Sequence, residues 1–102
     1  MTEQVVFKIR ESIKCSNGLQ LSVQASENHY CTPRNNEGPY THVEVYSYDL
    51  KIPNWKNPIH GYHRLTGIPE HVTYYNVPVQ QLLDLVYASG GIVLGNLPKI
   101  VL

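Results

Sequence analysis

The chain has 102 residues and a formal net charge of zero, with eight lysines and arginines against eight aspartates and glutamates. This length favours a single domain spanning residues 1–102, and the balanced charge argues against general binding to DNA or RNA. The sequence has no run of about 18 apolar residues, so we predict no membrane-spanning helix. A small core and a net charge near zero favour self-association, and we therefore expect a homo-oligomer.

The first predicted elements are strands. Residues 5–9 are typical of a strand, and Asn17-Gly18 is a strong turn signal between two further strands. A two-residue loop would mix polar and apolar residues on one face of this hairpin, whereas a loop of Ser16, Asn17 and Gly18 keeps the apolar residues together. We therefore predict the three-residue loop, with Gly18 in the left-handed conformation.

The segment from residue 42 to residue 48 alternates in polarity and predicts another strand. Val43 and Val45 are assigned to the core, and the opposite face carries a histidine, an acid and two tyrosines. The second face of residues 20–26 is small and polar. If the two strands pair, these side chains form one continuous polar surface.

Residues 50–70 contain three prolines and two glycines, so we predict a long irregular loop there. A connection of this length in a small domain is usually functional, disordered or a partner contact. Its aromatic and basic residues are Trp55, His60, Tyr62, His63 and Arg64.

The last third of the chain predicts a strand, a helix and a strand. Residues 72–77 are strand-like, and Pro78 suits the first turn of a helix that ends at Gly90-Gly91. Residues 92–94 form the last short strand, and residues 100–102 are an apolar tail that must pack on its own sheet or on a neighbour. The pattern as a whole predicts an α+β fold, a mainly antiparallel sheet with one helix packed on a face. The predicted core residues are Ile13, Cys15, Leu19, Leu21, Val23, Val43, Val45, Leu82, Leu83 and Val86.

Polar and aromatic side chains are concentrated between the second and third strands. The candidate ligand-binding residues are His29, Tyr30, Arg34, Tyr40, His42 and Glu44. Arginine presents a planar fork that suits phosphate or carboxylate, and histidine can donate, accept or transfer a proton. In the alternative interpretation the loop is only fastened to its sheet, with Arg34 paired to Glu37. Binding is favoured over catalysis, because short polar loops are more often recognition surfaces than active sites.

Other groups of histidine and cysteine residues give weaker evidence of a site. His60, His63 and His71 offer three imidazoles, but they complete no regular zinc pattern with Cys15 and Cys31. We therefore predict no metal site and no cofactor. The two cysteines can in principle form a disulfide. The first ten residues lack the apolar core of a signal peptide, however, so we expect a reducing cytoplasm and two buried thiols.

Three short motifs resemble a pattern in small uncharacterised proteins of bacteriophages and prophages. They are His29-Tyr30-Cys31-Thr32-Pro33-Arg34, Gly38-Pro39-Tyr40 and Val43-Glu44-Val45. A later segment, residues 75–79, leads into a helix that ends in a Gly-Gly pair, as in that group. The resemblance covers residues 19–45 and 74–92, and it implies a viral origin without assigning a role to any residue.

These observations together predict a phage-encoded accessory binding protein in the host cytoplasm. The expected partner is a host protein or a small anionic, nucleotide-like ligand, such as a signal used in antiviral defence. One alternative is a metal-independent phosphodiesterase that uses His29 and His42, with Arg34 on the phosphate. The other alternative is a structural or assembly protein without a ligand.

Overall fold

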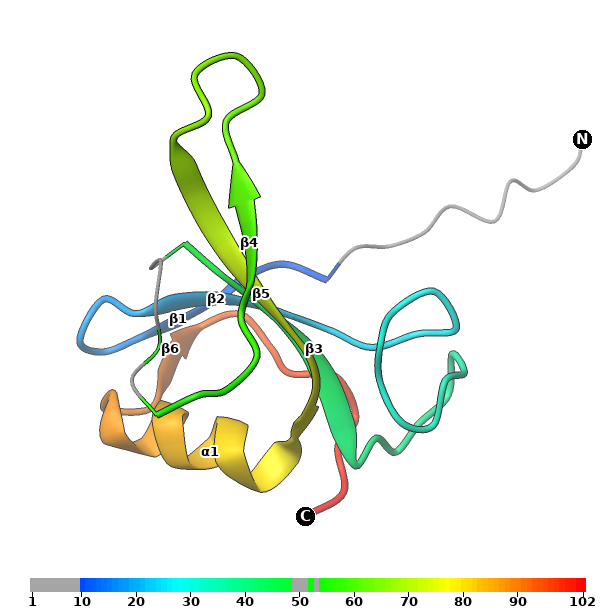
Figure 1. Ribbon diagram of the computed structural model, residues 1–102. Coiled ribbons are helices and arrows are strands. Elements are labelled where there is room, and N and C mark those ends of the chain that lie inside the picture. The colour runs from blue at the N-terminus through cyan, green and yellow to red at the C-terminus, as the bar shows by residue number, and fades with distance from the viewer. Residues whose placement is uncertain (1–9, 49–51, 53) are drawn as a thin grey trace, which may run out of the picture.

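The computed structural model describes residues 10–48, 52 and 54–102, and in these residues one antiparallel sheet of six strands is covered on one face by a single helix (Figure 1). The strand order is β4-β5-β3-β2-β1-β6. The elements are β1 (Ile13–Cys15), β2 (Gln20–Gln24), β3 (His42–Ser47), β4 (Ile59–Tyr62), β5 (Pro69–Pro78), α1 (Val79–Ala88) and β6 (Ile92–Leu94). This arrangement confirms the predicted α+β class. The strand predicted for residues 5–9 lies outside the described residues.

The β1–β2 hairpin has the predicted three-residue loop. Ile13 pairs with Leu21, and the Cys15 amide donates a hydrogen bond to the Leu19 carbonyl at 2.8 Å. Gly18 has the expected positive φ of 94°. This register places the apolar residues of both strands on the face that α1 covers.

The core contains most of the residues that the sequence assigns to it. Val43, Val45 and Leu21 are each fully buried, and Cys15 and Cys31 are buried free thiols. The assignment of Leu83 is wrong, because this residue is only half-buried, whereas Leu82 is 0 % exposed. The face of α1 toward the sheet is formed by Val79, Leu82, Leu85 and Val86. Leu83 lies one residue further around the helix, so its side chain is turned away from the centre of that face.

The prediction of an irregular loop over residues 50–70 is wrong for its second half. β4 pairs with β5, and the two strands form a long hairpin that projects beyond the rest of the sheet (Figure 1). Pro58 precedes β4 and Pro69 is the first residue of β5, where a proline interrupts no central hydrogen bond. The prolines thus bound the strands instead of excluding them. Residues 50, 51 and 53 lie outside the described part of the chain.

Strand β5 contains a bulge opposite Glu44. Val43 pairs with Val77, but Val45 pairs with Tyr74, so β5 has one residue more than β3 between these two pairs. Tyr75 and Asn76 occupy the bulge, and Asn76 has a positive φ of 49°. Asparagine tolerates this left-handed conformation better than most residues, which explains how β5 can bend here.

The helix ends as predicted. Gly90 and Gly91 both have positive φ, and the Gly91 amide donates to the Val86 carbonyl at 3.0 Å. β6 follows as the strand at one end of the sheet, with Ile92, Val93 and Leu94 exposed. Within the part of the chain that the structure describes, no helix has both the length and the apolar character needed to cross a membrane.

Candidate functional site

The polar side chains of β2, β3 and β5 form one surface on the face of the sheet that α1 does not cover. Ser22 pairs with Tyr46, Gln24 with Glu44, and Tyr46 also with Thr73 on the other side. Paired residues in neighbouring strands point to the same face. The surface predicted for β2 and β3 is therefore present, and β5 extends it.

This face is hollowed into a cavity of about 310 Å³, which we call the polar-face pocket. Its lining residues are Ser22, Gln24, His29, Glu44, Tyr46, Tyr48 and Thr73. The volume lies near the lower end of the range for small-molecule sites. Two of the six predicted site residues, His29 and Glu44, line it.

The residues 25–41, which we call the 25–41 loop, are fastened to the bulge of β5. The Asn76 amide donates to the Tyr30 carbonyl at 3.0 Å, and the Thr32 hydroxyl donates to the Asn76 side-chain oxygen at 3.3 Å. The rings of Tyr30 and Tyr75 stack with centroids 4.1 Å apart. The bulge thus determines where this loop lies relative to the pocket.

His29 is fixed at the wall of the polar-face pocket by its own loop. Its Nδ1 atom lies 2.6 Å from the Ser26 hydroxyl, and its backbone amide donates to the Ser26 carbonyl at 3.2 Å. The hydroxyl also accepts a hydrogen bond from the Asn28 amide at 3.0 Å, so it can donate to the imidazole. Among residues 10–48, 52 and 54–102, the other ring nitrogen has no hydrogen-bond partner and is available to a ligand.

Glu44 is the acid of the polar-face pocket, and its environment favours the neutral form. Burial raises the pKa of this carboxyl above its ordinary value, while His29, a hydrogen bond from the Tyr30 amide and Arg34 act in the opposite direction. Burial is the largest of these effects. A carboxyl of this kind can accept a hydrogen bond, or donate one when it holds a proton.

Arg34 is exposed and held in place by two contacts. Its guanidinium lies over the Tyr30 ring, 4.9 Å from the centroid, and its Nε donates to the Glu27 carbonyl at 3.1 Å. The pairing with Glu37, which belongs to the alternative interpretation of the loop, is not among the contacts of Arg34 in the described residues. The two terminal nitrogens have no partner among those residues, so the planar fork remains open to an anion.

The structure does not bring Tyr40 and His42 into the polar-face pocket. Tyr40 is 4 % exposed, and its hydroxyl donates to the Asn35 carbonyl at 2.7 Å. The Tyr40 backbone forms hydrogen bonds with the backbone of Lys99 and Val101, so this residue fastens the C-terminal segment to the 25–41 loop. His42 has its Nδ1 atom 2.9 Å from the Thr41 hydroxyl.

Five lining residues were not among the predicted site residues. They are Ser22, Gln24, Tyr46, Tyr48 and Thr73. The alternation of β2 and β3 already placed the first four on the polar face and was the signal that could have identified them. Thr73 required knowledge of the pairing between β3 and β5, which is a long-range contact.

The five histidines do not gather around a metal. Among the described residues, no group of three or more histidine, cysteine or acidic side chains is arranged to hold a metal ion. His71 stacks on Tyr46 with ring centroids 4.3 Å apart, and its ring occupies the space that a Cβ atom on Gly61 would need. Gly61 therefore allows the imidazole to lie across β4 and to support Tyr46 beside the polar-face pocket.

Comparisons of the chain with protein-family models, with curated proteins and with solved structures found no match. The resemblance to phage proteins thus stays a prediction.

Proposed function

We propose that this chain is a small binding protein that captures a nucleotide-like ligand. In this proposal a planar, hydrogen-bonding ring system enters the polar-face pocket and an anionic group binds to Arg34. The observation that carries the proposal is the geometry of the 25–41 loop. This loop places His29 at the wall of the pocket, where Glu44 also lies, and the same loop carries Arg34, whose guanidinium lies 4.9 Å from the centroid of the Tyr30 ring.

The lining of the polar-face pocket supports a planar ligand. Tyr46 and Tyr48 contact each other edge to face, with centroids 5.1 Å apart, and Tyr48 is 54 % exposed. Stacking of a base on an aromatic side chain contributes about 1–3 kcal/mol. Glu44, together with the hydroxyls of Ser22 and Thr73, offers the donors and acceptors that a ring edge requires.

The proposed biological role, in a bacterial host infected by a phage, follows from the resemblance to bacteriophage and prophage proteins. An accessory protein of this kind would act in the cytoplasm of an infected host and withhold a nucleotide-like signal from antiviral defence. Capture of a host protein is the second form of the proposal, and the exposed rings of Tyr30, Tyr48 and Tyr75 suit a protein interface equally. We also propose that the chain is a homo-oligomer.

Native mass spectrometry of the full chain purified from bacterial cells, followed by a thermal-shift screen of mono- and cyclic nucleotides, tests this proposal. A bound small molecule, released intact on denaturation, is the expected result, and the same compound should raise the melting temperature. Arg34→Ala should abolish the shift. Arg64→Ala, which removes an exposed arginine in the turn of the β4–β5 hairpin, is the matched control and should retain it.

Two results would reject capture of a nucleotide-like ligand. One is a chain that carries no small molecule and responds to no nucleotide. The other is release of a chemically altered compound, which would favour the enzymatic alternative. His42 does not line the polar-face pocket, so a His29–His42 pair has no support from the geometry and His29 with Glu44 would be the acid–base pair in that case.

A further inference from the structure

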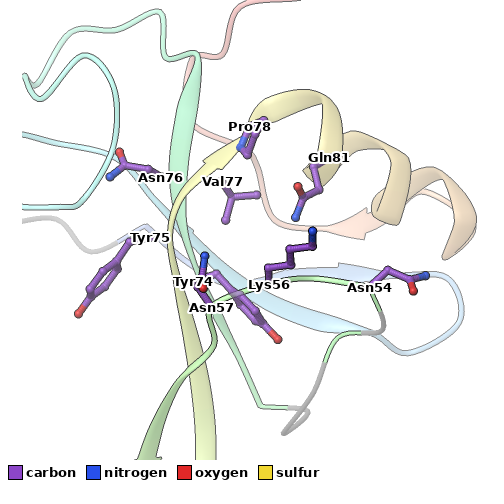
Figure 2. Close-up of a pocket in the computed structure, with 9 residues that line it drawn as sticks. All are labelled: Asn54, Lys56, Asn57, Tyr74, Tyr75, Asn76, Val77, Pro78 and Gln81. Carbon is purple, nitrogen blue, oxygen red and sulfur yellow. The ribbon is translucent and has the colours of Figure 1, made fainter.

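A second cavity, of about 380 Å³, lies on the opposite face of the sheet, which we call the helix-face pocket (Figure 2). Its lining residues are Asn54, Lys56, Asn57, Tyr74, Tyr75, Asn76, Val77, Pro78 and Gln81. Tyr74 pairs with Val45 and thus faces the core, whereas Thr73 pairs with Tyr46 and faces the polar side. This second cavity is therefore separate from the polar-face pocket and shares no lining residue with it, so its ligand is independent of the one proposed there.

The segment that carries Lys56 is fastened to the core. The Trp55 ring contacts Tyr74 edge to face at 5.1 Å, and the Ile52 amide donates to the Tyr74 hydroxyl at 3.2 Å. Asn54 and Asn57 have positive φ values of 69° and 62°, which turn the chain on either side of the lysine. These contacts hold the segment that carries Lys56 beside Tyr74 of β5, and Lys56 and Gln81 of the first turn of α1 line the same cavity.

Among the residues that line the helix-face pocket, Lys56 carries a positive charge and none carries a negative charge. Figure 2 shows the Lys56 amine directed toward the Gln81 carboxamide, and Asn57 is a further carboxamide residue of the lining. No described residue forms a hydrogen bond or an ion pair with this amine. The nearest acid on α1, Asp84, lines a neighbouring hollow and accepts a hydrogen bond from the Gln80 side chain at 2.8 Å.

We propose that the helix-face pocket binds a small anionic ligand through a phosphate-type oxygen group held by Lys56 and Gln81. An amine without a counter-charge, beside carboxamides that can donate, is suited to anionic oxygens, and such charge-assisted hydrogen bonds are the strong ones. A volume of about 380 Å³ exceeds what a single phosphate fills. The ligand is accordingly a small organic phosphate, whose remaining atoms contact Val77, Pro78 and the edge of Tyr74.

A nuclear magnetic resonance titration of the full ¹⁵N-labelled chain with inorganic phosphate tests this proposal, with sodium chloride used to hold the ionic strength constant. The expected result is a saturable shift of the Asn57 and Gln81 side-chain amide signals. Lys56→Gln should weaken the apparent affinity at least about tenfold, which is the loss of one charge-assisted contact. Lys14→Gln removes an exposed lysine of β1 that does not line the cavity and should leave the titration unchanged.

A second variant separates loss of binding from loss of folding. Gln81→Glu places a carboxylate in the cavity and in the first turn of α1, which has no acidic residue. The negative charge should abolish the phosphate response and raise the melting temperature, because it interacts favourably with the N-terminal end of a helix. A parallel titration with acetate distinguishes a phosphate site from a carboxylate site.

Three outcomes would overturn the proposal. The first is the absence of a saturable shift at the Asn57 and Gln81 amides. The second is an unchanged titration of a folded Lys56→Gln variant. The third is a response to acetate that equals or exceeds the response to phosphate, which would make the cavity a carboxylate site.

Discussion

Tyr30 of the 25–41 loop stacks on Tyr75 in the bulge of β5, and the Arg34 guanidinium lies over the same Tyr30 ring. The orientation of the arginine therefore depends on a residue that is 45 positions from Tyr30 in the sequence. Arg34, the proposed anion-binding residue, is thus connected through Tyr30 to β5, the strand that fixes the position of the 25–41 loop.

Tyr75→Ala should weaken binding of a nucleotide-like ligand without unfolding the chain. Loss of the stacked pair removes about 0.5–1.5 kcal/mol of stability and allows Tyr30 and Arg34 to move together. Tyr87→Ala is the matched control, because Tyr87 is a tyrosine of α1 that is 88 % exposed. Thermal unfolding and the nucleotide thermal-shift assay together check the prediction. Equal behaviour of the two variants would show that the stack does not position the arginine.

Arg34→Lys should reduce ligand binding almost as much as Arg34→Ala. Lysine retains the charge but cannot present two parallel donors to phosphate or carboxylate. Folding should be little affected, with a change of about 0.5 kcal/mol or less in the free energy of unfolding, since Arg34 is exposed. Arg64→Lys is the corresponding control. Full binding by the Arg34→Lys variant would contradict the role of the planar fork.

Leu82→Ala should destabilise the chain far more than Leu83→Ala. Leu82 is 0 % exposed in the core cluster, and truncation of a buried leucine costs about 2–5 kcal/mol. Leu83 is half-buried and outside that cluster, so its truncation should cost about 1 kcal/mol or less. Denaturant unfolding of both variants checks the prediction, and a reversed order would show that the helix presents another face.

Glu44→Gln should stabilise the chain at neutral pH. Burial raises the pKa of Glu44 above the ordinary value of 4.5 for this side chain, so the folded state binds the proton more readily than the unfolded state does. The stabilising contribution of the neutral carboxyl is complete below the unfolded pKa and is lost as the pH rises through the folded pKa. The free energy of unfolding of the variant should therefore exceed that of the parent chain by an amount that grows from about pH 4.5 upward.

Thermal unfolding of the parent chain and of Glu44→Gln between pH 4 and pH 7 measures this difference. Glu11→Gln, which removes one negative charge from an exposed residue, is the matched control. A stability difference that shrinks as the pH rises would contradict the assigned direction of the Glu44 pKa.

Self-association should depend on β6 more than on the C-terminal tail. Val93 is 58 % exposed on this strand at the end of the sheet, and a charge on such a strand opposes pairing with another chain. Val93→Lys should lower the mass measured by light scattering. Deletion of residues 100–102 should instead reduce stability, because the Val101 amide donates to the Tyr40 carbonyl of the same chain at 2.9 Å. A parent chain that is monomeric at micromolar concentration would end the proposal.

Local sequence signals predicted the parts of the fold that depend on neighbouring residues. The three-residue turn at Gly18, the core valines of β3 and the glycine end of α1 follow from period and turn chemistry alone. The β4–β5 hairpin does not follow from local signals, because Pro58 and Pro69 have the same appearance in the sequence whether they interrupt a segment or stand at the ends of strands, as they do here. Whether a proline ends a strand or interrupts a segment depends on which strand pairs with it, and strand pairing is a property of the tertiary structure.

The candidate site also has one part that the sequence predicts and another that only the three-dimensional structure shows. The alternation of β3 placed Glu44 on a polar face, and the burial and the neighbours of its carboxyl were visible only in three dimensions. The chemistry of Tyr40 suits a binding site, but its side chain is buried and its backbone is hydrogen-bonded to the C-terminal segment. The helix-face pocket could not be predicted, since it joins residues 54–57 to the first turn of α1 across more than 20 positions.

The bulge of β5 has a thermodynamic consequence for the two cavities. Asn76 lines the helix-face pocket, and its backbone and side chain also hold Tyr30 and Thr32 at the base of the 25–41 loop. A ligand that displaces Asn76 on one face changes the position of the loop that carries His29 on the other. We therefore expect binding at the two cavities to be cooperative or antagonistic. Linkage requires that each ligand alters the affinity for the other by the same factor.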